Sequence, residues 1–232
     1  MKIGLIMFSL NEINGMKVTL PRIKSEWVDD IVIIDGGSTD GTIAYAESLG
    51  FRVVRQTRKG GIIPAMKEIF EQTDCDFVIT FTPDNNMIPE KIPELVAKAR
   101  EGYDMVVVSR YLDGAKSEDD HLISGFGNWM FTTMVNVLFK TKYTDVLGFY
   151  RGYRLALLDE LGIDIEPSID TQLSIRCKKD NKKVIEIPGD EPKRVGGQSS
   201  RSIIGHGSYE LYTIIREFFN LGRDTRLEKK IN

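Results

Sequence analysis

Residues 31–42, IVIIDGGSTDGT, constrain the fold of this chain more than any other stretch. Four β-branched apolar residues run directly into Asp35, and such an unbroken run is typical of a strand buried on both faces of a parallel sheet. The two glycines that follow release the backbone for a sharp exit, and Ser38 or Asp40 can cap the next helix. Asp35 is therefore expected at the carboxyl end of an inner strand, where open α/β sheets bind ligands. A well-capped turn without a ligand is the alternative.

Strand patterns alternate with helix patterns along most of the chain. The expected strands are 3–8, 31–34, 51–55, 76–81, 105–109 and 184–187. The expected helices are 39–50, 64–72, 89–99, 126–139, 167–179 and 209–219. This alternation predicts βαβ units, and therefore an α/β fold with a mostly parallel sheet flanked by helices. We expect one main domain over residues 1–200, and an amphipathic helix with a basic tail over 201–232.

The composition excludes several classes of protein. A net charge of −3 over 232 residues argues against broad nucleic-acid binding, which needs a basic face. Cys75 and Cys177 form neither a disulfide framework nor a metal spacing, so buried thiols of a cytosolic protein are expected. His121 and His206 are isolated in the sequence, so a histidine metal site is not expected. The chain opens directly onto an apolar strand and has no run long enough to cross a bilayer, so neither a signal peptide nor a membrane span is expected.

A second acidic strand end follows the apolar run DFVITF. The sequence there is Thr82-Pro83-Asp84-Asn85-Asn86, ahead of a helix that opens at Pro89. Asp84 and Asn86 offer oxygen ligands of the kind that Mg²⁺ or Mn²⁺ takes, often together with substrate phosphates. A polar turn before a helix that starts with proline is the alternative.

Together these segments resemble the family-2 glycosyltransferases of the GT-A fold, nearest to the polyprenyl-phosphate (dolichyl-phosphate) sugar synthases. The matching segments, in family order, are FSLNE (8–12), IIDGGSTDGT (33–42), TPDNNMIPEKIPEL (82–95), VVVSRYLDG (106–114), TDVLGFYRGYR (144–154), IDTQLSIRCKK (169–179) and VIEIPGDEPKRVGG (184–197). The resemblance covers the chain from its start to about Gly197. It implies a GT-A fold, which is a Rossmann-like fold that binds nucleoside diphosphate sugars.

The resemblance implies a donor site for a UDP- or GDP-sugar. The residues that it places there are Phe8, Leu10, Glu12, Asp35, Gly37, Lys59, Gly60, Pro83 and Asp84. The first three border the base, and Asp35 contacts the base or the ribose. Phe8 stands where the family usually has proline, and Leu10 where it often has an aromatic residue, so weaker stacking of the base is expected.

The metal motif of the family, Asp-x-Asp, falls on Thr82-Pro83-Asp84. Thr82 therefore replaces the first carboxylate, which is expected to weaken the affinity for Mg²⁺ or Mn²⁺. Asp84 and Asn86 remain as the expected metal ligands.

Catalysis and acceptor binding are assigned to the second half of the chain. Asp170, near the start of a helix, matches the acidic residue of the family at the acceptor side and is the expected base for a hydroxyl acceptor. A phosphate acceptor arrives largely ionised and needs cationic orientation instead. Arg151, Arg154 and Arg194 are the expected phosphate ligands, with Arg151 also assigned to catalysis, because guanidinium forks match phosphate oxygens. A helix cap and surface ion pairs are the alternatives for these residues.

The sequence thus predicts a metal-dependent, inverting glycosyltransferase. The predicted acceptor is a polyprenyl phosphate or a glycan, such as a polysaccharide precursor. A nucleotidyltransferase is one alternative, although the first strand is not followed by a glycine-rich loop with a lysine. A non-catalytic protein that binds nucleotide sugars is the other alternative, and Thr82 favours it.

The sequence does not determine what two helical segments and one loop pack against. Residues 126–139 place Trp129, Met130, Thr133, Met134, Val137 and Leu138 on one face. Core packing explains this stripe, while the resemblance suggests presentation of a lipid acceptor. Residues 209–219 form an amphipathic helix, and Arg223, Arg226, Lys229 and Lys230 follow it. That helix suits the inner face of a membrane, the domain itself or a second subunit, so we expect a cytoplasmic protein with either a peripheral membrane contact or a homodimer. Residues 111–121 are expected to form a mobile surface loop.

Overall fold

The computed structural model describes residues 1–119, 122–196 and 203–221. Its strands are β1 (Ile3–Ser9), β2 (Asp30–Asp35), β3 (Arg52–Arg55), β4 (Phe77–Phe81), β5 (Met105–Ser109), β6 (Arg151–Arg154) and β7 (Val184–Pro188). Its α-helices are α1 (Ile13–Thr19), α2 (Thr42–Ser48), α3 (Ile62–Phe70), α4 (Ile92–Arg100), α5 (Leu122–Phe139), α6 (Leu157–Glu160), α7 (Ile169–Lys179) and α8 (Ile203–Phe218). Short 3₁₀ turns lie at η1 (Leu20–Arg22), η2 (Ser25–Trp27) and η3 (Pro89–Lys91).

Within these residues the strands form one seven-stranded sheet in the order β3-β2-β1-β4-β6-β5-β7. All neighbours in the sheet are parallel except β6, which is antiparallel to both β4 and β5. The predicted α/β fold with a mostly parallel sheet is therefore confirmed. Since β1 lies between β2 and β4, the chain leaves β1 in one direction across the sheet and later returns on its other side.

Strand β6 was not predicted, because its sequence is RGYR, with charged residues at both ends and a central glycine. Gly152 is required there for packing. A Cβ atom at this position would lie 2.4 Å from Cε1 of Phe77, which is closer than side chains tolerate. The strand is set by its neighbours rather than by its own apolar pattern.

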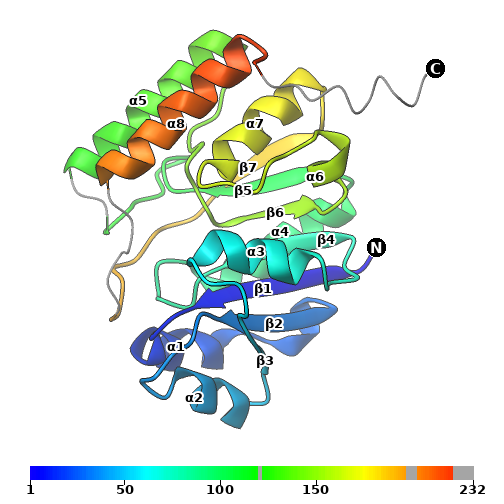
Figure 1. Ribbon diagram of the computed structural model, residues 1–232, viewed down its shortest axis with the longest axis vertical. Helices are drawn as coiled ribbons and strands as arrows, with labels where there is room; N and C mark the ends of the chain where they lie inside the picture. Colours follow the sequence, from blue (N-terminus) through cyan, green and yellow to red (C-terminus); the bar gives the residue numbers. More distant parts are fainter. Residues whose placement is uncertain (120–121, 197–202, 222–232) are drawn as a thin grey trace.

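Side chains alternate between the two faces of the sheet, so each strand contributes to two cores. In β1, Ile3, Leu5 and Met7 belong to one core, which α1, α2 and α4 cover. Ile6 and Phe8 belong to the other core, which α3, α6 and α7 cover. Figure 1 shows α3 and α7 in front of the sheet and α4 behind it. The fold is therefore a three-layer arrangement of helices, sheet and helices.

Helices α5 and α8 lie side by side and pack on α7, outside the three layers (Figure 1). A small third core joins them, made of Phe131, Val135, Val146, Ile175 and Ile214. Helix α8 begins at Ile203, six residues before the predicted start. The predicted basic residues Arg223, Arg226, Lys229 and Lys230, together with His121 and Gly197, lie outside the described residues. Among the residues that are described, no helix combines the length and the apolar character needed to cross a bilayer.

The predicted core stripe on α5 is wrong for at least two of its members. Trp129 is 61% exposed and Val137 is 71% exposed, whereas the buried side of the helix carries Phe131 and Val135. The cause is tertiary, because α7, α8 and the segment 143–147 pack on the other side of α5.

The predicted mobile loop is held at its centre. The backbone N–H of Lys116 donates to Asp190, and Ser117 forms a bridge with Glu191.

Candidate functional site

A cavity of about 880 Å³ opens at the carboxyl ends of the central parallel strands. This is the place at which the order of the strands reverses around β1, where open α/β sheets bind ligands. Loops that follow β1, β3, β4, β5 and β7 contribute to its wall. The parallel sheet therefore brings together segments that lie far apart in the sequence.

One end of the cavity is formed after β1 and β3. The predicted residues that line it are Phe8, Leu10, Lys59 and Gly60. Phe8 is fixed by an edge-to-face contact with Phe149, with ring centroids 5.7 Å apart, whereas the Leu10 side chain is 51% exposed. This end offers the apolar side chains of Phe8 and Leu10 in the same wall as the basic Arg58 and Lys59, which suits a nucleotide base and its phosphates.

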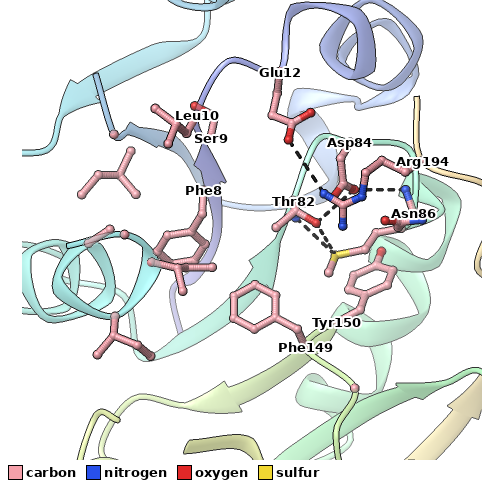
Figure 2. A pocket seen from close by; sticks show the side chains of 18 of the residues that line it. Phe8, Ser9, Leu10, Glu12, Thr82, Asp84, Asn86, Phe149, Tyr150 and Arg194 are labelled. Carbon is pink, nitrogen blue, oxygen red and sulfur yellow. Dashed lines mark hydrogen bonds and ion pairs between the residues drawn. The ribbon is translucent and has the colours of Figure 1, made fainter. Parts of the chain in front are cut away.

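An acidic centre lies in the wall beside this end, and Figure 2 shows its side chains pointing toward one another. Arg194 Nη1 is 3.0 Å from Asp84 Oδ2 and 3.9 Å from Glu12 Oε1. The other oxygen of Asp84 accepts hydrogen bonds of 3.1 Å from the Thr82 hydroxyl and from the backbone N–H of Asn86. Asp84 is thus held from both sides.

Asp84 is buried at this centre, and Glu12 is partly buried. Burial raises the pKa of Asp84, although Arg194 acts in the opposite direction. Burial and then the nearby Asp84 raise the pKa of Glu12 to about 7. Glu12 Oε2 is buried, and no hydrogen bond reaches it within the described part of the chain. Positive charge is therefore favourable at this centre.

The oxygens at this centre fit a hard divalent cation. Asp84 and Glu12 supply carboxylates, and Asn86 lines the same wall. The side-chain N–H of Asn86 donates to the carbonyl of Pro192 over 2.8 Å, which leaves its Oδ1 as the available ligand atom. The described residues contain no group of three or more acidic, histidine or cysteine side chains that could hold a metal. Mg²⁺ and Mn²⁺ fit such an oxygen set.

Asp35 does not line the cavity, which corrects the predicted contact with the base or the ribose. Its carboxylate is fully buried and accepts hydrogen bonds from the Ser9 hydroxyl (2.8 Å), from the backbone N–H of Gly37 (2.9 Å), and from the backbone and hydroxyl of Ser38 (2.7 and 2.6 Å). Gly37 has a φ of 103° and is also absent from the wall. Asp35 therefore shapes the turn beside the cavity. Pro83 does not reach the wall either.

Two of the three predicted phosphate arginines are also corrected. Arg151 is fully buried, and its guanidinium donates to the carbonyls of Gly148 (2.7 Å) and Asp170 (3.0 Å). Arg154 lies at the far end of the antiparallel β6, beside the start of β4, and is paired with Asp104 (2.7 Å) and Glu160 (2.9 Å). Of the three, Arg194 alone lines the cavity.

Asp170, the predicted base, lies in the first turn of α7 and does not line the cavity. Its Oδ1 is 3.1 Å from Arg151 Nε. This pair joins α7 to the sheet. Arg151 is fully buried, which corrects its predicted direct catalytic role, whereas the role of Asp170 as a base stays a prediction.

Arg110 and His206 are among the wall residues that were missed. Arg110 is paired with Asp145 (2.7 Å) and with Glu191 (3.3 Å). It directly follows β5, and this position at the end of a strand was the signal in the sequence that could have identified it. His206 also lines the cavity, and its Nε2 is 3.4 Å from Glu210, one turn further along α8. No local sequence pattern indicated that His206 belongs to the site, because the tertiary packing of α8 brings it there.

The comparisons with known proteins show the family of the chain. The model of glycosyl transferase family 2 matches residues 5–162, which is more than half of the chain. The dolichol-phosphate mannosyltransferase of Pyrococcus furiosus is 27% identical over 217 residues, which cover 86% of this chain and 59% of that protein. The undecaprenyl-phosphate 4-deoxy-4-formamido-L-arabinose transferase of Klebsiella pneumoniae is 30% identical over 185 residues, which cover 75% of this chain and 53% of that protein. The chain thus spans between half and two thirds of the length of these relatives.

The fold is similar to that of the glucosyl-3-phosphoglycerate synthase from Mycobacterium tuberculosis, which was crystallised in complex with Mn²⁺, UDP and phosphoglyceric acid. The TM-score is 0.70 at 18% identity, over 94% of this chain and 78% of that one. This likeness confirms the GT-A fold predicted from the sequence. Together with the family match, it shows that this chain belongs to glycosyltransferase family 2.

Proposed function

We propose that this protein moves a sugar from a nucleoside diphosphate sugar, carrying UDP or GDP, to an acceptor phosphate with inversion at the sugar carbon. The observation that carries the proposal is the cavity at the carboxyl ends of β1 and β4, with Glu12, Asp84 and Arg194 in one wall. Family membership agrees with it.

The donor fits the cavity in one direction. Phe8 and Leu10 border its base, and the diphosphate reaches the acidic centre, with Lys59 beside it. A Mg²⁺ or Mn²⁺ ion held by Asp84 and Asn86, with Glu12 in reach, would neutralise the charge that develops on the departing diphosphate. Lys59 and Arg194 add positive charge at the same wall, which stabilises that departing group further.

A phosphate fits the acceptor side better than a glycan hydroxyl does. A hydroxyl acceptor needs a base, and the predicted base, Asp170, is paired with Arg151 away from the cavity wall. A phosphomonoester is largely ionised near neutral pH and needs cations to orient it. Arg110, Arg194 and His206 line the cavity. The relatives named above carry dolichol phosphate and undecaprenyl phosphate in their names, and a polyprenyl phosphate is the acceptor that we propose here.

An exposed apolar surface on α5 and α8 supports a lipid acceptor. We call it the apolar helix face, and its most exposed members are Ile123, Phe126, Trp129, Val137, Tyr212 and Phe219. Helix α5 contains no charged residue over its 18 residues. The exposed Lys140 and Lys142 follow it directly. Aromatic and apolar side chains with lysines at their edge suit the surface of an anionic bilayer, and we propose that this face lies on one.

The proposed function is tested first by donor binding. Calorimetric titration with UDP-glucose, UDP-N-acetylglucosamine and GDP-mannose, each with and without Mn²⁺, is expected to show binding of at least one of them, and Asp84→Asn is expected to lose it. Transfer is then followed with radiolabelled donor and undecaprenyl phosphate in detergent micelles, with the unphosphorylated alcohol as the control acceptor. A folded protein that binds none of the donors would refute the proposal.

A nucleotide-sugar-binding protein without transferase activity is the second candidate. Thr82 favours it, because one carboxylate of the metal motif is absent, and so does the occupation of Asp84 by Arg194. Binding of a donor without turnover to any phosphate or hydroxyl acceptor would select this candidate.

A further inference from the structure

The contact between Arg194 and Asp84 determines how a cation can enter the cavity. We propose that Arg194 is the resident counter-ion of Asp84, and that a divalent cation binds this centre only in exchange for the guanidinium. The proposal deepens the proposed function and rests on its use of a cation, but its test needs neither donor nor acceptor.

The geometry leaves Asp84 without a vacant oxygen. Its Oδ1 accepts hydrogen bonds from Thr82 and from the backbone of Asn86, and its Oδ2 is 3.0 Å from Arg194 Nη1. The Asp84 side chain is almost completely buried, so a cation cannot approach it from another open side. A cation that binds Asp84 must therefore take the position that Arg194 now holds (Figure 2).

The backbone around Arg194 is tied to the same turn that carries Asp84. The side chain of Asn85 donates to the carbonyl of Lys193 over 2.9 Å, and that of Asn86 donates to the carbonyl of Pro192 over 2.8 Å. The backbone N–H of Val195 donates to the carbonyl of Asp84 over 2.9 Å. Arg194 is therefore delivered to Asp84 by anchored backbone on both sides. Its long side chain can leave the carboxylate while these anchors stay in place.

Because of their charges, the Arg194 guanidinium and a divalent cation cannot both bind Asp84 at the same time. Asp84 and the nearby Glu12 form a centre that a single guanidinium neutralises in part, since Arg194 Nη1 lies 3.9 Å from Glu12. A divalent cation at the same oxygen would repel the guanidinium strongly, because both would be desolvated at short range. When a cation takes the place of Arg194 at Asp84, the guanidinium becomes available to bind an anionic group at the same wall. Cation binding and phosphate binding by Arg194 are therefore linked, and each favours the other.

The exchange predicts that removing the guanidinium helps the cation. Free Mn²⁺ is titrated into the full chain without nucleotide, and the unbound ion is measured by electron paramagnetic resonance. Arg194→Gln is expected to bind Mn²⁺ at least tenfold more tightly than the unaltered protein. Lys193→Gln, which removes the same charge from the neighbouring residue, is expected to stay within twofold of it.

Further variants tie the effect to this centre. Adding Asp84→Asn to Arg194→Gln is expected to abolish the gain. Arg194→Lys keeps a positive charge and serves where Arg194→Gln folds poorly, and it is expected to bind Mn²⁺ with intermediate affinity. Unchanged or weaker Mn²⁺ binding by the Arg194 variants, or an equal gain in Lys193→Gln, would overturn the exchange. A failure of donor binding would instead refute the proposed function, and the comparison of Mn²⁺ affinities would still test the exchange.

Discussion

Gly15 in α1 lies directly against Pro83 in the turn that carries Asp84. A Cβ atom at residue 15 would be 2.4 Å from the Pro83 carbonyl oxygen and 2.7 Å from Cα of Asp84. Both neighbours are backbone atoms, so neither can move aside as a flexible side chain would. The helix that follows Glu12 and the turn that presents Asp84 therefore fix each other's position, and with it the distance between the two carboxylates.

Gly15→Ala is expected to damage both the fold and the site. Inserting a methyl group against rigid backbone costs about 1–3 kcal/mol, and we expect a loss of this size in the free energy of unfolding measured in urea. Binding of Mn²⁺ is expected to weaken as well, because the turn with Asp84 must shift. Gly127→Ala, at a glycine of α5 with open space around it, is the control and is expected to be neutral or stabilising by up to about 1 kcal/mol. Equal losses in both variants would contradict this argument.

Most of the fold was predictable because most of its strands are local runs of apolar residues in the sequence. The segments before Asp35 and Asp84 are continuous and apolar, and parallel pairing then brings their carboxyl ends to one edge. The short strand with Gly152 has no such run, and it forms only because β4 and β5 provide the pairing partners. Local pattern thus predicted the sheet but not its antiparallel insertion.

The candidate site was predictable only where a residue follows a parallel strand. Asp84 and Arg194 line the cavity as predicted, but Arg151 and Asp170 pair with each other in the interior. An arginine that recognises phosphate and one that holds a helix to a sheet have the same local sequence signal. His206 shows the converse, since its place depends on how α8 packs on α5 and α7.

Glu12→Gln is expected to change how stability depends on pH. The pKa of Glu12 is raised from its ordinary value of 4.5 to about 7 by burial and by Asp84. Between these values the folded protein binds a proton that the unfolded chain releases, so this group contributes stability below about pH 4.5 that is lost as the pH rises through 7. Glutamine removes this loss.

The measurement is the difference in unfolding free energy between Glu12→Gln and the unaltered protein, at pH 4.5 and at pH 8 and without divalent ions. We expect the variant to gain about 1–2 kcal/mol relative to the unaltered protein between these two values, allowing for screening by solvent. Taking the difference at each pH cancels the titrating groups that do not interact with Glu12, because both proteins share them. A difference that does not change with pH would show that Glu12 titrates normally.

His206→Gln is expected to weaken acceptor binding selectively. The imidazole lines the cavity and is oriented by the buried Glu210, 3.4 Å from its Nε2. We expect the KM for a short-chain polyprenyl phosphate to rise about tenfold, which corresponds to about 1.4 kcal/mol for one lost contact to a charged group, while the KM for the donor stays within twofold. Tyr209→Ala, an exposed position on the same helix, is the control. An equal rise in both KM values would place His206 at the donor instead.

Trp129→Glu combined with Phe126→Glu is expected to release the protein from membranes. The two rings are in contact, with centroids 5.6 Å apart, and both side chains are about 60% exposed on the apolar helix face. Charged residues cannot enter the acyl boundary without a large desolvation cost, so binding to vesicles with 30% phosphatidylglycerol, measured by co-sedimentation, is expected to fall more than tenfold. The control is Leu49→Glu, at an exposed apolar residue that follows α2 on another part of the surface. The opposite outcome has two parts: the unaltered protein does not bind vesicles, and the double substitution dissociates a dimer in light scattering. In that case the apolar helix face pairs two copies of the chain, and the membrane proposal fails.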